Sequence, residues 1–196
     1  MSSTPARILT VCTGNICRSP FLERALQAEL DRSWGTGRIE VSSGGTGALA
    51  GHPMEDQARA LLEAQGYAAD GFRARDLTSG LVADADLVLT ATRAHRGKAM
   101  ALHPRAVRYT FTFREFAHLV SGLTDAELWT GGDDQPADHV ARVVTLAAGQ
   151  RGMGAPLADD DADIVDPYRR PVQVFHAMTE QIMGSLPQVV RALAKP

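Results

Sequence analysis

A cysteine and an arginine, separated by five residues, directly follow a short aliphatic run near the start of the chain. Cys12 comes after residues 7–11, which have the composition of a strand, and Arg18 precedes Ser19 and Pro20, a helix-start signal. A strand, a tight loop and a helix N-terminus are therefore predicted. In that arrangement the backbone N–H groups and the positive end of the helix dipole favour a bound anion. The loop is predicted to be a phosphate cradle that carries a thiol.

The chemistry open to this pair is attack on phosphorus. N–H donors, a helix dipole and a guanidinium favour the thiolate, so we expect Cys12 to be ionised at rest. The planar fork of Arg18 matches two phosphoryl oxygens, which lysine could not do. Gly14 and Asn15 tolerate positive φ, as a tight loop requires. A buried cysteine without a chemical role is the alternative, and the surrounding pattern outweighs it.

Residues 11–20, Val-Cys-Thr-Gly-Asn-Ile-Cys-Arg-Ser-Pro, closely resemble the phosphate loop of the low-molecular-weight protein tyrosine phosphatases. The resemblance implies that Cys12 is the nucleophile and that Arg18 binds the phosphoryl group. It also implies a set of loop residues that contact the substrate: Thr13, Gly14, Asn15, Ile16, Cys17 and Ser19.

Four supporting roles follow from the same resemblance. Ser19 would stabilise the departing thiolate, and Asn15 with Ser43 would hold the loop in its shape. Cys17 would form a reversible disulfide with the nucleophile. For Ser43 a solvent-facing strand end is an equal alternative, and for Cys17 the alternative is a buried thiol that never reacts.

Displacement of a phosphate monoester also needs a proton for the departing oxygen, and later a base to activate water. The family carries its general acid in a late Asp-Pro motif. The resemblance therefore gives this role to Asp166 of Asp166-Pro167-Tyr168, although a turn residue before proline is the plain alternative. Tyr168 is expected to form an aromatic wall of the substrate pocket.

Three positions depart from the family's pattern at the rim of the pocket. Leu49, expected to contact the substrate, stands where many relatives have Trp or Tyr. Phe72 stands where many have His, and Arg169 where a second Tyr often follows. These departures leave the chemistry intact and leave the breadth of the phosphotyrosine slot open.

The elements that must position these residues alternate in type. Strand-like runs occupy residues 7–11, 38–43, 86–91 and 107–111, and helical spacing is found over 19–34, 53–65, 93–102, 113–120, 136–148 and 171–193. Strands separated by helices predict a flavodoxin-like α/β fold, a four-stranded parallel sheet flanked by helices on both faces. Ligands of such sheets bind at the carboxyl ends of the strands, which is where Cys12 stands.

Composition limits the remaining possibilities. The 196 residues, 44% hydrophobic, fit one domain, so residues 1–196 are predicted to form a single phosphatase domain with an insertion or elaborated loop at about 122–162. A net charge of −3 supplies no basic field for nucleic acid or an anionic membrane. No apolar run approaches the roughly 18 residues of a membrane span. Only two cysteines are present, so we expect a protein of the reducing cytoplasm.

No cofactor is expected. The six histidines show no paired spacing typical of metal ligands, so no metal is implied, and most of them are expected at the surface or at helix ends; they stand at positions 52, 95, 103, 118, 139 and 176.

The predicted function is hydrolysis of phosphotyrosine or a small aryl phosphate through a cysteinyl-phosphate on Cys12, with phosphate or another oxyanion able to occupy the loop. Two alternatives stay open. One is arsenate reduction with an external thiol, since no cysteine follows Cys17 to relay electrons. The other is a phosphoprotein-binding module without turnover, although binding alone needs neither a nucleophile nor an acid.

Overall fold

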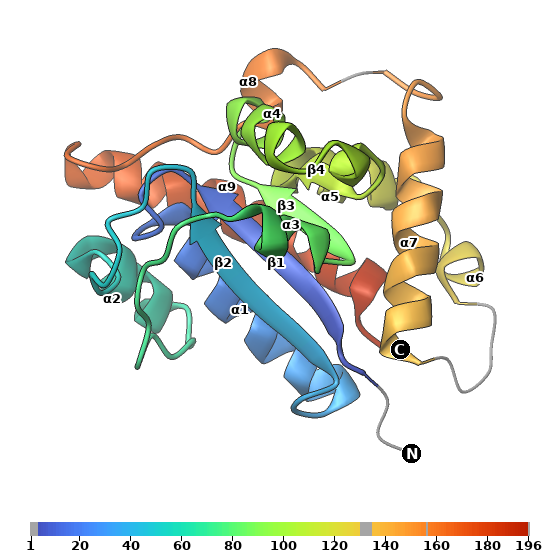
Figure 1. Ribbon diagram of the computed structural model, residues 1–196, viewed down its shortest axis with the longest axis horizontal. Coiled ribbons are helices and arrows are strands. Elements are labelled where there is room, and N and C mark those ends of the chain that lie inside the picture. The colour runs from blue at the N-terminus through green and yellow to red at the C-terminus, as the bar shows by residue number, and fades with distance from the viewer. Residues whose placement is uncertain (1–3, 130–134, 156, 196) are drawn as a thin grey trace.

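The computed structural model describes residues 4–129, 135–155 and 157–195, and a parallel sheet lies at its centre. Its strands are β1 (Ala6–Cys12), β2 (Ile39–Gly45), β3 (Leu87–Thr90) and β4 (Thr110–Thr112), in the order β2-β1-β3-β4 (Figure 1). All neighbouring strands run parallel, and Cys12 pairs with Gly45 at the carboxyl end of β1. The predicted four-stranded α/β fold is confirmed.

Helices cover both faces of the sheet because the strands alternate in what they present. Ile8 of β1 packs into the larger core with α1, α5, α7 and α9, whereas Leu9 and Val11 pack against α3, α4 and η1 on the other face. The helical segments within the described residues are α1 (Arg18–Trp34), α2 (Asp56–Ala64), α3 (Ser79–Ala83), α4 (Arg93–Leu102), the 3-10 helix η1 (Pro104–Arg108), α5 (Phe113–Ser121), α6 (Asp125–Leu128), α7 (Pro136–Gln150), α8 (Asp159–Ala162) and α9 (Val172–Leu193). None of them is long and apolar enough to cross a membrane.

The starts of α1, α2 and β4 differ from the sequence-based expectation, and α2 begins at Asp56 and not at residue 53. Helix α1 begins at Arg18 with Cys17 as its N-cap and without a side-chain cap, so Ser19 lies inside the first turn rather than before it. The hydroxyl of Ser19 is engaged elsewhere, and the N–H groups of the helix start stay available to an anion. The fourth strand begins later than predicted, because η1 occupies 104–108 with Pro104 at its start.

The segment 122–162 contains helices that contribute to the core, while residues 130–134 and 156 lie outside the described residues. Val140, Val143 and Ala147 of α7 are fully buried in the same core as α5 and α9. Gln135, the N-cap of α7, accepts a hydrogen bond from Arg38 just before β2. Helix α7 therefore starts near the amino ends of the strands, the edge opposite Cys12.

Candidate active site

The loop between β1 and α1 holds the predicted nucleophile and curls tightly at Asn15. Cys12 is only 2% exposed. Asn15 adopts φ 54°, in the left-handed region that Gly, Asn and Asp tolerate best. Gly14 does not take a positive φ, so the conformational freedom expected of both residues is used by Asn15 alone. A hydrogen-bonding side chain at this position compensates for the strain of that backbone.

The buried side chain of Asn15 braces the loop from three directions. Its Nδ2 donates to Ser19 Oγ at 2.9 Å and to Ser43 Oγ at 2.8 Å, and its Oδ1 accepts from the Arg75 N–H at 2.8 Å. The structure thus brings together Asn15, Ser19 and Ser43, which stand apart in the chain. Ser43 faces this network and not solvent, since it is 1% exposed.

The hydroxyl of Ser19 lies beside the nucleophile. Its Oγ is 3.0 Å from Cys12 Sγ. Because that oxygen accepts from Asn15 Nδ2, its single hydrogen is free to be donated to the sulfur. A donor in this position stabilises a thiolate.

Arg18 is the charged group of the loop and is almost fully buried, with 4% of its surface exposed. Its Nη2 lies 2.7 Å from Asp166 Oδ2, and its Nη1 donates to the Ile164 carbonyl oxygen at 3.3 Å. Its Nε has no hydrogen-bond partner in the described part of the chain. A buried N–H without a partner is costly, and an oxyanion bound in the loop would supply one.

The segment after β2 packs on the backbone of the loop. The N–H groups of Thr46, Gly47 and Leu49 donate in turn to the carbonyl oxygens of Cys12, Thr13 and Gly14, at 2.9 to 3.1 Å. This approach needs glycine at position 45, where a Cβ would lie 2.5 Å from the Thr13 carbonyl oxygen. Leu49, predicted at the rim, is thereby brought next to the loop.

A second layer of side chains, which sequence reasoning missed, supports Ser43. Ser43 Oγ donates to the carboxylate of Glu23 on α1, and Arg75 Nε donates to the Ser43 carbonyl oxygen at 2.8 Å. Burial raises the pKa of Glu23. Glu23 has the polar residue type expected on the solvent face of an amphipathic helix, and only the tertiary fold turns it toward β2.

His95 on the first turn of α4 also reaches the loop. Its Nε2 lies 2.8 Å from Thr13 Oγ1 and its Nδ1 lies 2.8 Å from Thr92 Oγ1. Burial, followed by the nearby charges of Arg18 and Lys98, lowers the pKa of His95 to about 4, so the ring is neutral at pH 7. His95 and His139 both stand at helix ends, in the first turns of α4 and α7, and both are buried, with 5% and 0% of their surface exposed.

Asp166 reaches the site on the segment between α8 and α9. That segment is tied to the carboxyl end of β3, because the Ile164 N–H donates to the Ala91 carbonyl oxygen and the Arg93 N–H donates to Asp163 Oδ1, both at 2.8 Å. Asp166 Oδ1 accepts from the Tyr168 N–H at 3.2 Å. Two segments far apart in the sequence, the start of α1 and the segment before α9, thus meet at Arg18.

The aromatic candidate beside Asp166 is exposed. Tyr168 has 39% of its surface accessible, and the Arg169 guanidinium lies 5.1 Å from its ring centroid. Arg169 itself adopts φ 57°, an uncommon conformation for a residue with a long side chain. Phe72, in contrast, is buried with Arg24 over its ring at 5.9 Å, so it belongs to the core beneath the rim.

Cys17 is a free, buried thiol. Burial, with Cys12 close by, raises the pKa of the Cys17 thiol well above its ordinary value. Cys17 is therefore held in its protonated form at neutral pH.

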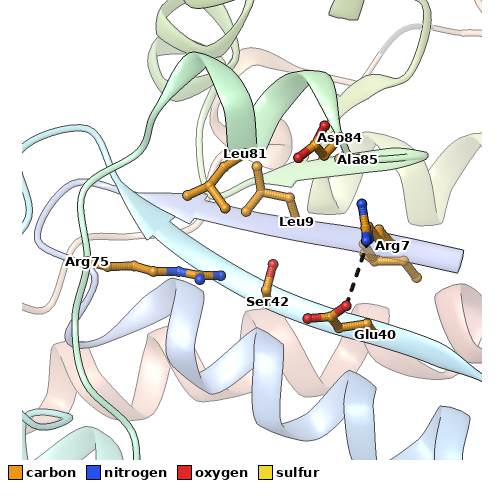
Figure 2. A pocket seen from close by; sticks show the side chains of 9 residues that line it. Arg7, Leu9, Glu40, Ser42, Arg75, Leu81, Asp84 and Ala85 are labelled. Carbon is orange, nitrogen blue, oxygen red and sulfur yellow. Dashed lines mark ion pairs between the residues drawn. The ribbon is translucent and has the colours of Figure 1, made fainter. Parts of the chain in front are cut away.

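Two other features lie apart from the loop. Across the described ranges, no group of three or more His, Cys, Asp or Glu side chains could hold a metal ion. A small pocket lies between β1, β2 and α3, where Leu9, Ser42 and Leu81 line it near the Arg7–Glu40 ion pair (Figure 2). None of the predicted site residues lines this pocket.

A parallel α/β sheet with a buried cysteine, an arginine and a phosphate-type loop at the end of its first strand defines a class of cysteine-dependent phosphatases. The model of the family described as "Low molecular weight phosphotyrosine protein phosphatase" matches residues 7–128. The chain belongs to the low-molecular-weight protein tyrosine phosphatase family.

Individual proteins are similar to this chain in sequence or in fold. The probable low molecular weight protein-tyrosine-phosphatase EpsP of Ralstonia nicotianae is 35% identical over 108 residues, which are 55% of this chain and 70% of EpsP. The structure of Wzb from Vibrio vulnificus in complex with benzylphosphonate has a TM-score of 0.66 at 24% identity, covering 96% of this chain and 99% of that one. The YwlE arginine phosphatase from Geobacillus stearothermophilus has a TM-score of 0.65 at 27% identity, covering 95% and 91%.

Proposed function

We propose that this chain hydrolyses aryl phosphomonoesters, with phosphotyrosine in proteins as the substrate class, through a cysteinyl-phosphate on Cys12. The observation that supports this most strongly is the buried guanidinium of Arg18, whose Nε lacks a partner among the described residues, in a loop that starts at a buried thiol. The benzylphosphonate complex of the similar Wzb protein supports an oxyanion as the occupant of the loop.

In the first step the Cys12 thiolate attacks phosphorus. The S–P bond forms as the bond between phosphorus and the aryl oxygen breaks, and protonated Asp166 gives its hydrogen to the departing oxygen. The charge on the three other phosphoryl oxygens is taken up by Arg18 and by the loop N–H groups. The 2.7 Å contact between Asp166 and Arg18 supports this division of roles, because it keeps the acid beside the phosphoryl-binding group.

In the second step water replaces the sulfur. The Asp166 carboxylate takes a proton from water, the water oxygen attacks phosphorus, the S–P bond breaks, and inorganic phosphate and the thiolate are released. The Ser19 hydroxyl, 3.0 Å from Cys12 Sγ, supports the departing thiolate. Asn15 and Ser43 keep the loop amides aligned throughout.

The finer assignments belong to the same proposal. Leu49 and Tyr168 flank the aryl group, and a disulfide between Cys12 and Cys17 is the oxidised, inactive form. The raised pKa of Cys17 would make its attack on an oxidised Cys12 slow at neutral pH. The reducing cytoplasm is the compartment that suits two free thiols.

A panel of phosphorylated substrates tests the proposal. Purified, reduced protein without added metal is assayed at mildly acidic pH on 4-nitrophenyl phosphate and on matched phosphotyrosine, phosphoserine and phosphoarginine peptides. The phosphoarginine arm is needed because a similar structure is that of an arginine phosphatase. Arsenate with glutaredoxin or mycothiol tests the reductase alternative.

We expect turnover of the aryl phosphate and of the phosphotyrosine peptide, and little of the phosphoserine peptide. Faster turnover of phosphoarginine, or reduction of arsenate without phosphatase activity, would replace the proposed substrate class. Binding of phosphopeptide with no turnover of any substrate would favour the binding module.

A further inference from the structure

The imidazole of His95 links the loop residue that follows the nucleophile to the turn between β3 and α4. We propose that His95 is a positioning residue, which fixes Thr13 and through it the first backbone amides of the phosphate cradle. The proposal rests on the proposed function and deepens it, because it adds a residue from a part of the sheet to which the phosphate-loop motif assigns nothing. It starts from two contacts, each of 2.8 Å, between the ring nitrogens and the hydroxyls of Thr13 and Thr92.

Thr13 is the loop residue whose side chain is least restrained by packing. It is exposed, whereas Cys12 before it and Asn15 after it are buried. Its carbonyl oxygen accepts from the Gly47 N–H at 3.1 Å, which holds its backbone from the β2 side. The bond to His95 holds its side chain from the α4 side. Gly14, which comes next, has no side chain with which to do the same.

The hydroxyl of Thr92 contacts His95 twice, and we assign the hydrogen of the neutral ring from these contacts. Thr92 is the N-cap of α4, and its Oγ1 accepts from the His95 backbone N–H at 3.3 Å. Its hydroxyl hydrogen remains available for Nδ1 of the ring, 2.8 Å away, and we assign that hydrogen bond to Thr92 as donor. The ring hydrogen accordingly lies on Nε2 and is donated to Thr13 Oγ1. The Thr13 hydroxyl keeps its own hydrogen for a second acceptor, such as a phosphoryl oxygen.

His95 is neutral at pH 7, so it orients Thr13 by hydrogen bonds and does not attract the phosphate by charge. The ring is buried, and Arg18 and Lys98 oppose a second positive charge, while Asp163 and Asp166 favour it less strongly. With the pKa lowered to about 4, the ring is neutral under assay conditions above about pH 5. Its contribution therefore consists of two hydrogen bonds in fixed directions.

Because loop amides must point at the equatorial oxygens of the transferring phosphoryl group, small displacements of Thr13 reduce the rate. A ring that merely filled space would affect stability without this effect. A positioning role of His95 can be distinguished from a space-filling role in two ways. One substitution replaces His95 with an aromatic ring that cannot form hydrogen bonds, and the other removes the Thr13 hydroxyl and leaves His95 in place.

The experiment is a double-mutant cycle of His95→Phe and Thr13→Val, with kcat and KM measured on 4-nitrophenyl phosphate and the Kd of inorganic phosphate measured by calorimetry. His95→Gln, which keeps an N–H donor, is the conservative variant. His176→Gln, at an exposed position of α9, is the control for loss of a histidine.

Each single substitution is expected to lower kcat about tenfold with a KM rise below about threefold, and the double variant should be no more than about twofold worse than either. His95→Gln should stay within about threefold of wild type, and His176→Gln should be unchanged. A kcat for His95→Phe within about twofold of wild type, or losses that multiply to about a hundredfold in the double variant, would overturn the proposal.

Two further outcomes are decided by the same measurements. If His95→Phe does not fold, Thr13→Val decides alone, because Thr13 is exposed, and an unchanged kcat overturns the positioning role. If the wild type shows no turnover, the proposed function fails, while phosphate binding still tests His95. Phosphate Kd should rise about fivefold in each single variant and no further in the double; an unchanged Kd overturns the role.

Discussion

The buried guanidinium of Arg18 contacts the half-exposed carboxylate of Asp166. The predicted general acid, Asp166, therefore lies beside the arginine predicted to bind phosphate. Their 2.7 Å contact joins the first turn of α1 to the segment before α9. A phosphoryl group entering the loop would compete with Asp166 for the guanidinium. This exchange would leave Asp166 beside the departing oxygen and free to act on it.

Asp166→Asn should therefore slow aryl phosphates with poor leaving groups far more than those with good ones. The amide cannot donate a proton to an alkoxide-like oxygen, whereas 4-nitrophenolate departs without one. We expect kcat to fall about 100-fold or more for phenyl phosphate and clearly less for 4-nitrophenyl phosphate. Pre-steady-state rates on the two esters measure this, and equal losses on both would contradict the general-acid role.

The titration of His95 makes a separate prediction about stability. Its pKa is lowered in the folded protein to about 4 from an ordinary 6.5, so the unfolded chain binds more protons between these values. The free energy of unfolding should therefore rise as pH increases from about 4 to 6.5, and be lost in the opposite direction. The contribution is on the order of 3 kcal/mol.

Urea denaturation of wild type and His95→Gln at several pH values measures this contribution. The difference between the two proteins isolates His95 from Glu23, whose raised pKa gives a slope of the opposite sign. The difference should change across pH 4 to 6.5 and be flat above it. A constant difference would show that the folded protein does not disfavour the imidazolium.

At the scale of elements, the turn after β2 shapes the phosphate loop through direct backbone contact. Gly45→Ala would place a Cβ 2.5 Å from the Thr13 carbonyl oxygen and 2.9 Å from Ala48 Cβ, so backbone must move. We expect a destabilisation of about 1–3 kcal/mol together with a fall in kcat. Denaturation curves and steady-state assays measure both.

Gly47→Ala is the matched control, because a Cβ there meets nothing within 4 Å. It should change the free energy of unfolding by less than about 1 kcal/mol and leave kcat near wild type. Similar effects of the two substitutions would mean that the close approach at Gly45 is unimportant.

How far the sequence alone predicts the site depends on how local each contact is. The loop from Cys12 to Arg18 is contiguous, so its residue types and the flanking strand and helix signals suffice to place it. Ser43 and Asp166 depend on the family resemblance, because their contacts span the sheet. Glu23 and His95 carry no local signal, since a polar residue on a helix looks the same whether it faces solvent or a loop.

The fold was predictable for a similar reason. Strand β1 is an aliphatic and β-branched run, β2 alternates and β3 is a continuous apolar run, and their alternation with helices restricts the topology. Strand β4 has only three residues, and the 3-10 helix before it contains Val107, a β-branched residue typical of strands, so the start of β4 could not be located. The cap at α1 was misplaced because Ser19 has the residue type of an N-cap while its hydroxyl is directed to Cys12.

At the scale of the whole molecule, we propose that residues 1–196 form one folding unit in which the segment 122–162 is an added part of the core. A cluster of three rings, with His139 buried and Trp34 and Trp129 partly buried, joins this segment to α1. Trp129 stacks on His139 at 4.1 Å, and Trp34 lies 5.7 Å from each of them. His139 Nε2 donates to the Ala192 carbonyl oxygen at 2.8 Å, which attaches α7 to α9.

His139→Ala should lower the free energy of unfolding by about 2–4 kcal/mol, since it removes a buried ring and leaves a buried carbonyl oxygen unpaired. Unfolding should stay a single transition, with tryptophan fluorescence and far-ultraviolet circular dichroism coinciding. Because α7 starts at the amino edge of the sheet, kcat should hardly change. Thr145→Ala, at an exposed position of α7, is the control.

Two separate transitions in the wild type would contradict the single folding unit. A loss of kcat in His139→Ala at temperatures where the variant is folded would instead connect the inserted segment to catalysis.

The central claim is that Cys12 becomes covalently phosphorylated during turnover. Rapid acid quench of the reduced protein with radiolabelled aryl phosphate, followed by peptide mapping, measures this directly. We predict label on the peptide that contains Cys12, formed and lost at rates that match turnover, and no label in Cys12→Ala, which should still bind inorganic phosphate. Turnover without label on Cys12, or activity of Cys12→Ala near that of wild type, would contradict the account.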